Sequence, residues 1–119
     1  MSTILVVDDE PAIRALVTDL LRYEGHTVLS AANGQEALDV ASVEHPDLIV
    51  MDIMMPVMDG QEALRRLHER GDLKGTLVIL ASATVRLERP DFPIQAFLRK
   101  PFDLDQLMET VSRVLERSA

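Results

Sequence analysis

The chain has 119 residues, 12 of them Lys or Arg and 20 Asp or Glu, so its formal net charge is −8. This length fits one domain, residues 1–119, and 47 % apolar residues provide a core, which argues against disorder. The acidic balance argues against direct binding to nucleic acid or an anionic membrane surface, and the absence of cysteine excludes disulfides and thiolate metal sites.

Short apolar runs alternate with amphipathic stretches, which is the pattern of strands alternating with helices. Residues 3–7 are apolar on both faces, as a buried parallel strand should be, and Pro11 suits the first position of the helix that follows. Gly25 ends that helix, and residues 27–31 form a weaker strand. No apolar run is long enough to span a membrane and no signal peptide begins the chain, so we expect a cytoplasmic protein.

Three later helices begin with a capping pattern, in which Asn or Asp is followed three positions later by Glu or Gln. The expected caps are Asn33, Asp59 and Asp103. Further strands are expected at residues 48–51, 77–81 and 96–98. We interpret these caps, and the apolar stripes of the helices that they open, as purely structural.

Strand and helix therefore alternate about five times, which predicts an α/β fold with a five-stranded parallel sheet and helices on both faces. The right-handed crossover rule favours a doubly wound, flavodoxin-like sheet of strand order 2-1-3-4-5. The connection from Ser82 to Gln95 is barely long enough for a parallel crossover, which needs about a dozen residues.

Pro90 and Pro93 break any long helix in that connection. We therefore expect the fourth helix to be shortened or absent, with at most a turn around residues 85–88. Leu87, Phe92 and Ile94 would then cover the sheet in its place. The alternative is a normal short helix that ends before Pro90.

Polar residues follow four of the five predicted strands. They are Asp8 and Asp9 after the first strand, Asp52 after the third, Ser82 (followed by Ala83) after the fourth, and Lys100 after the fifth. Ligands of open parallel sheets bind outside the carboxyl ends of the strands, so we expect these residues to share one site.

Three neighbouring carboxylates repel one another and become favourable around a divalent cation. Oxygen ligands without His or Cys select a hard ion such as Mg²⁺. A carboxylate beside that ion is a possible nucleophile for phosphoryl transfer, in which Lys100 and the Ser82 hydroxyl would neutralise further charge. Taken alone, each piece has a structural interpretation, such as acids at a helix start or a solvated lysine.

Four segments together resemble the signatures of the response-regulator receiver domain of bacterial two-component signalling. They are residues 4–10 (Ile-Leu-Val-Val-Asp-Asp-Glu), residues 51–60 (Met-Asp-Ile-Met-Met-Pro-Val-Met-Asp-Gly), Ser82-Ala83 and residues 100–102 (Lys-Pro-Phe). The resemblance covers essentially the whole chain. It implies Mg²⁺-dependent transfer of a phosphoryl group from a histidine kinase, a phosphotransfer protein or a small phosphodonor.

The resemblance also implies a role for each site residue. Asp52 would be the phosphoacceptor. Mg²⁺ would be held by Asp8, Asp9, Asp52 and the backbone carbonyl of Met54. The phosphoryl group would be held by Ser82, Lys100 and the backbone amide of Ala83. Ser82 and Phe97 would form the switch, although Phe97 also fits as an ordinary strand residue, and Pro101 would follow a cis peptide bond.

The implied output is a changed surface near the fifth strand that a downstream protein target recognises, in a switch that is not a turnover enzyme. The stretch from Ser82 to Lys100 is shorter than is usual in the family, which leaves that output surface open. One alternative is a receiver-like interaction scaffold that does not use phosphate. Another is an Asp-nucleophile phosphatase, although its usual second acid would fall at Met54. A stand-alone regulator and a receiver excised from a longer chain remain equally open.

Overall fold

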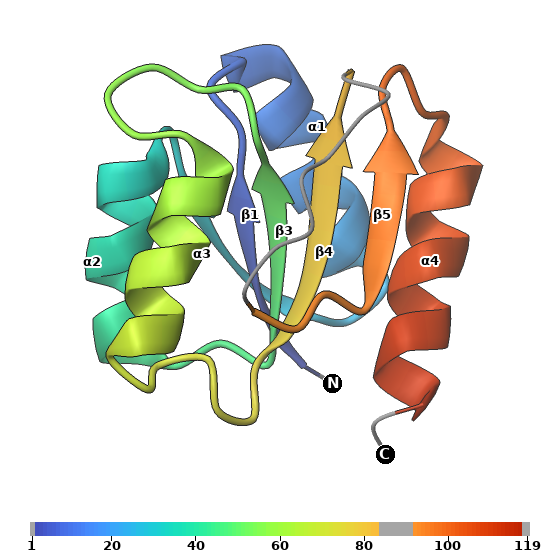
Figure 1. The fold of residues 1–119 in the computed structure, drawn as a ribbon. Helices are drawn as coiled ribbons and strands as arrows, with labels where there is room; N and C mark the ends of the chain where they lie inside the picture. Colours follow the sequence, from blue (N-terminus) through green and yellow to red (C-terminus); the bar gives the residue numbers. More distant parts are fainter. Residues whose placement is uncertain (1, 84–91, 118–119) are drawn as a thin grey trace.

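The computed structural model describes residues 2–83 and 92–117 (Figure 1). Its strands are β1 (Thr3–Val7), β2 (Thr27–Ala31), β3 (Leu48–Asp52), β4 (Leu77–Ser82) and β5 (Ala96–Arg99). The helices of the described ranges are α1 (Pro11–Tyr23), α2 (Gly34–Glu44), α3 (Gly60–Glu69) and α4 (Leu104–Arg117). All neighbouring strands pair in parallel, in the order β2-β1-β3-β4-β5, so the predicted doubly wound sheet is confirmed.

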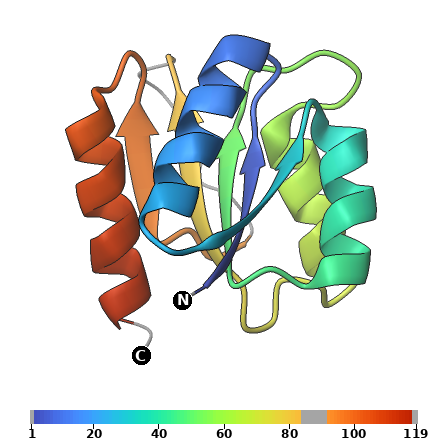
Figure 2. The same cartoon turned by 180° about the vertical axis from the view of Figure 1, so that it is seen from behind.

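Two apolar layers enclose the sheet. Helices α2 and α3 cover the face seen in Figure 1, whereas α1 and α4 lie on the other face, which Figure 2 shows. Successive residues of β1 point to opposite layers, with Leu5 in the first layer and Ile4 in the second. A strand buried on both faces needs apolar residues at every position, which is why these strands read as continuous apolar runs.

The connection before β5 is described only from residue 92 onward, so the helical turn predicted at residues 85–88, with Leu87, lies outside the described residues. Phe92 is buried in the first apolar layer, and Ile94 packs against the same layer. The prediction that these two side chains cover the sheet there is confirmed.

Each predicted cap accepts a backbone hydrogen bond from the residue three positions later. The distances are 2.9 Å from Glu36 to Asn33, 2.8 Å from Glu62 to Asp59 and 2.7 Å from Gln106 to Asp103. These bonds satisfy amide groups that have no partner inside the helix, so the caps fix where α2, α3 and α4 begin.

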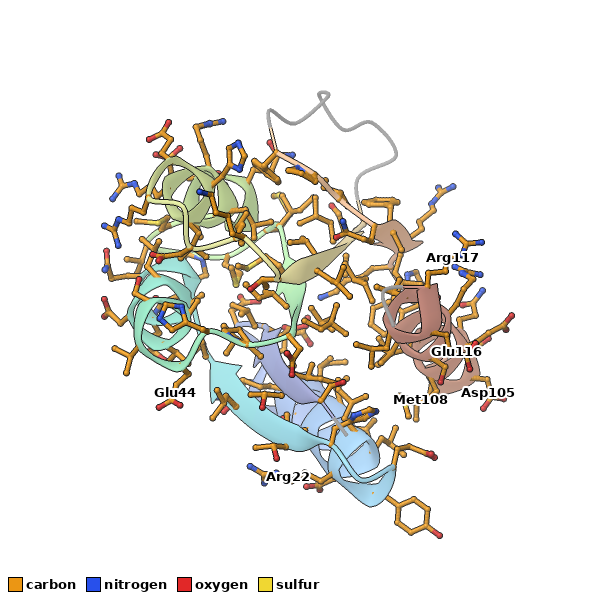
Figure 3. The ribbon with its side chains drawn as sticks, turned by 90° about the horizontal axis from the view of Figure 1, so that it is seen from below. Arg22, Glu44, Asp105, Met108, Glu116 and Arg117 are labelled. Carbon is orange, nitrogen blue, oxygen red and sulfur yellow. The ribbon has the colours of Figure 1, made fainter. Side chains whose placement is uncertain are left out.

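The outward faces of the helices carry charge. In Figure 3, Asp105 and Glu116 extend from α4 away from the sheet, and Arg22 lies at the end of α1 beside β2. Arg22 donates a hydrogen bond of 3.0 Å to the carbonyl of Val28, so its side chain occupies part of the open edge of β2. No helix that the structure describes is both long and apolar enough to cross a membrane.

Replacing Thr18 with Val is expected to stabilise the protein by about 1 kcal/mol. The Thr18 side chain is buried in α1, and its hydroxyl makes no hydrogen bond within the described part of the chain. A methyl group of similar shape removes that unsatisfied polar atom. Urea unfolding of both proteins measures the difference, and a less stable variant would show that the hydroxyl has a partner in solution.

Candidate functional site

The candidate site lies at the carboxyl edge of the sheet, at the upper ends of the strand arrows in Figure 1. Asp8 directly follows β1, and Lys100 directly follows β5. Asp52 and Ser82 are the last residues of β3 and β4 and still pair in the sheet, with Ala81 and Arg99 respectively. The predictions for β3, β4 and β5 therefore end one residue early, because side-chain polarity marks the sheet edge while backbone pairing continues, whereas the predicted ends of β1 and β2 are confirmed.

The three predicted metal-binding aspartates come together. Asp8, Asp9 and Asp52 each offer a carboxylate oxygen, and these oxygens all lie within 4.8 Å of one another. Asp8 and Asp52 are only 5 % and 4 % exposed, whereas Asp9 faces solvent. The cluster thus consists of two buried acids at the strand ends, Asp8 and Asp52, and one acid, Asp9, that is accessible to ions in solvent.

Lys100 links the two buried carboxylates. Its Nζ lies 3.0 Å from Oδ2 of Asp8 and 3.2 Å from Oδ2 of Asp52. Its backbone amide donates a 2.7 Å hydrogen bond to the carbonyl of Ser82, which fixes the lysine beside the end of β4. The peptide bond between Lys100 and Pro101 is cis, as expected from the resemblance.

The surroundings shift the pKa of two site groups. Burial raises the pKa of Asp52 above its ordinary value, and the charges of Asp8 and Asp9 add to this effect while Lys100 opposes it. Burial by itself would lower the pKa of Lys100, but its hydrogen bond to Asp8 and its attraction to Asp52 outweigh burial and raise it. The lysine is therefore charged at neutral pH, and ionised Asp52 depends on nearby positive charge.

The donor set fits Mg²⁺. The cluster offers carboxylate oxygens alone, which suits a hard cation that retains several of its waters. The Lys100 ammonium contacts two of the three acids, Asp8 and Asp52, so negative charge is in excess within the cluster and a divalent ion would balance it. Asp8, Asp9 and Asp52 are the side chains that would hold such an ion.

The remaining predicted residues lie at the end of β4, in the loop after β3 and in β5. Ser82 is fully buried at the end of β4, and Ala83 is exposed directly after it. Met54 lies in the loop after β3 and is 64 % exposed, and the role expected of it concerns its backbone carbonyl alone. Phe97 lies in β5 and is 40 % exposed, which fits neither a core residue nor a fully solvated one.

Sequence reasoning missed Arg14. Its guanidinium donates a 2.7 Å hydrogen bond to the backbone carbonyl of Asp8, while the amide of Glu10 donates to Oδ1 of Asp8 at 3.0 Å. These bonds hold the turn between β1 and α1, from which Asp8 and Asp9 project. The available signal was a basic residue in the first helical turn after an acidic pair, where the helix dipole does not favour it.

Comparison with known protein families matches nearly the whole chain. The sequence profile of the response regulator receiver domain matches residues 4–112. Response regulator MprA of Mycolicibacterium vanbaalenii is 38 % identical over 117 residues, which cover 97 % of this chain and 51 % of MprA. The chain thus spans about half the length of the curated relatives it matches.

Solved structures agree with this match. Response regulator TrrA of Thermotoga maritima, in complex with Mg²⁺-BeF, is 34 % identical with a TM-score of 0.84, and the alignment covers 96 % of this chain and 99 % of TrrA. A CheY-like receiver domain protein from Methanospirillum hungatei is 30 % identical with a TM-score of 0.89, covering 99 % and 96 % respectively.

Proposed function

The chain belongs to the response regulator receiver domain family, and we propose that it is a phosphorylation switch in which Asp52 accepts the phosphoryl group. The observation that carries the proposal is the contact of the Lys100 ammonium with both Asp8 and Asp52 across the ends of three strands. This arrangement places a potential nucleophile, a cation and an acid cluster at one edge of the sheet.

In the proposed reaction, a carboxylate oxygen of Asp52 attacks the phosphorus of the donor. A new O–P bond forms, and the bond from phosphorus to the donor breaks, so that the leaving group keeps the electron pair, as acetate ion from acetyl phosphate or as an imidazole that is protonated on nitrogen from a phosphohistidine. For a histidine kinase or phosphotransfer protein the broken bond is P–N, and the leaving group is the histidine imidazole. Catalysis here is mainly positioning and charge neutralisation.

The side chains have separate parts in this proposal. Lys100 neutralises one phosphoryl oxygen, and the Ser82 hydroxyl and Ala83 amide donate to others. Mg²⁺, held by Asp8, Asp9, Asp52 and the Met54 carbonyl, would supply positive charge that reduces the repulsion between the Asp52 carboxylate and the negatively charged phosphodonor. The similarity to TrrA, whose structure is a complex with Mg²⁺-BeF, supports this choice of metal.

The output would be a change of surface near β5. Ser82, moving toward the new phosphoryl group, would leave room into which the half-exposed ring of Phe97 turns. A downstream protein target in the cytoplasm would recognise the changed face. The switch holds one phosphoryl group per chain, and it is not a turnover enzyme.

Incubation with acetyl phosphate and Mg²⁺ is expected to add one phosphoryl group per chain, measured by intact mass, and EDTA is expected to prevent this addition. Repeated hydrolysis of p-nitrophenyl phosphate, a stable ester, would instead favour the phosphatase alternative. A well-folded chain that acquires no label from acetyl phosphate, or from a phosphorylated histidine donor, would favour the interaction scaffold.

A further inference from the structure

The loop between β3 and α3, residues 53–59, is fastened close to the proposed phosphoacceptor. The Ile53 amide donates to the carbonyl of Ala81 at 3.0 Å, and the Gly60 amide donates to the carbonyl of Ile53 at 2.9 Å. Both ends of the loop are therefore fixed directly beside Asp52, and the loop has a further support at Met58, near its C-terminal end.

That support comes from the start of α2. The amide of Gly34 donates a 3.1 Å hydrogen bond to the carbonyl of Met58, which joins two segments that are distant in sequence. The Met58 side chain is half-buried and packs against the apolar layer under α2 and α3. The loop is thus held at Met58 by a backbone bond on one side and by side-chain packing on the other.

Gly34 is required here for space. A Cβ atom at this position would lie 2.4 Å from the carbonyl oxygen of Met58, closer than real Cβ atoms come to other atoms. Gly34 has no left-handed φ, so the requirement is close approach of two backbones. Because the nearest obstructing atom is a backbone oxygen, an added methyl group would have to move the loop or the helix.

The loop has little freedom to absorb such a movement. A Cβ at Gly60 would lie 2.3 Å from the carbonyl oxygen of Asp52, so α3 also begins in direct contact with the end of β3. Val57 has a φ of 70°, which is unfavourable for a β-branched residue and persists only where the surrounding contacts impose it. A shift at Met58 is therefore transmitted toward Met54 and Asp52.

We infer that Gly34 is a positioning residue for the phosphoacceptor site, acting through Met58 on the loop that follows Asp52. The inference rests on the proposed function, since the loop matters through Asp52 and the Met54 carbonyl. A displacement of about 1 Å in a reacting group can lower a rate about a hundredfold.

The test is Gly34→Ala, with Gly71→Ala as the matched control. Gly71 has a φ of 80° and open space around it, so its replacement strains the backbone without touching the site. Ala is the better helix former by about 1 kcal/mol, so helix propensity alone favours Gly34→Ala. We expect acetyl phosphate labelling of Gly34→Ala to slow at least tenfold at a temperature where the protein is fully folded, and labelling of Gly71→Ala to keep its rate.

A second measurement needs neither metal nor phosphodonor. In metal-free protein, the NMR amide signals of Ile53 and Gly60 should shift in Gly34→Ala and stay in place in Gly71→Ala. Unchanged signals together with a wild-type labelling rate would overturn the inference. If wild-type protein takes no label, the proposed function fails, whereas the amide signals still decide whether Gly34 positions the loop.

Should Gly34→Ala not fold, Met58→Ala releases the same loop without adding bulk. It removes the packing that holds Met58 against the apolar layer, and the same slower labelling and shifted Ile53 signal are expected. Labelling at the wild-type rate in a folded Met58→Ala protein would contradict the inference.

Discussion

Replacement of Lys100 with Met is expected to destabilise the metal-free protein by about 3 kcal/mol, because it leaves buried carboxylates without their cation. The Lys100 side chain is 20 % exposed, and those of Asp8 and Asp52 are 8 % and 5 % exposed, so water replaces the lost contact poorly. The same change removes the ammonium that would face the phosphoryl group, so labelling by acetyl phosphate should fall by orders of magnitude. Urea unfolding in EDTA and intact mass measure the two effects.

The loss of stability in the Lys100→Met variant should depend on pH. The pKa of Asp52 is raised in the folded state, so the folded protein binds protons more readily, and stability falls as pH rises from 3.8 through the folded-state pKa. Lys100 opposes this shift, so its removal raises that pKa further and enlarges the total loss of stability between acid and neutral pH. The pKa of Lys100 is itself raised, so its own contribution is complete below 10.5 and lost above the folded-state value. The stability of the Lys100→Met variant should therefore be closest to that of wild type at about pH 4, and the variant should be much less stable than wild type near pH 7.5.

Lys74→Met is the control for this change, because Lys74 is an exposed residue of the turn before β4. It should leave stability within about 0.5 kcal/mol of wild type at both pH values. Equal behaviour of the two variants would show that Lys100 is a solvated charge and that the ion pairs do not persist in solution.

Mg²⁺ is expected to raise the melting temperature of the wild-type protein. It binds the folded acid cluster and has no such site in the unfolded chain, so at ten times its Kd it adds about 1.4 kcal/mol, or roughly 5 °C for a domain of this size. Calcium-free buffer with the ionic strength held constant by NaCl separates this effect from general screening.

Asp9→Asn should reduce this gain, because it removes the exposed carboxylate of the cluster while leaving the buried Lys100 contacts in place. Asp105→Asn makes the same chemical change on the outer side of α4 and should keep the full gain (Figure 3). Unchanged melting of the wild type at millimolar Mg²⁺ would count against the cluster as a metal site.

The arrangement of the sheet could be predicted because its strands are buried on both faces. Such strands have apolar residues throughout, so β1 and β3 stand out in the sequence, and the crossover rule then orders them. The last residues of β3 and β4 were missed for a physical reason. Asp52 and Ser82 are polar, yet their backbones still pair with neighbouring strands, and a pattern of side chains does not report backbone pairing.

The composition of the site followed from the same rule, since the ends of parallel strands meet at one edge. The contacts that hold the site residues in place could not be predicted from this rule. The bond from Gly34 to Met58 joins an α2 residue to the loop after β3, and the Arg14 bond ends on a backbone carbonyl. Neither hydrogen bond produces a periodic pattern in the sequence, because each depends on how two separate elements approach one another.

The central claim is tested most directly by the intact mass of Asp52→Asn after incubation with acetyl phosphate and Mg²⁺, beside wild type and Asp105→Asn. Wild type and Asp105→Asn should each gain one phosphoryl group, and Asp52→Asn should gain none while remaining folded. Labelling of Asp52→Asn to the wild-type extent would contradict the assignment of Asp52 as the phosphoacceptor.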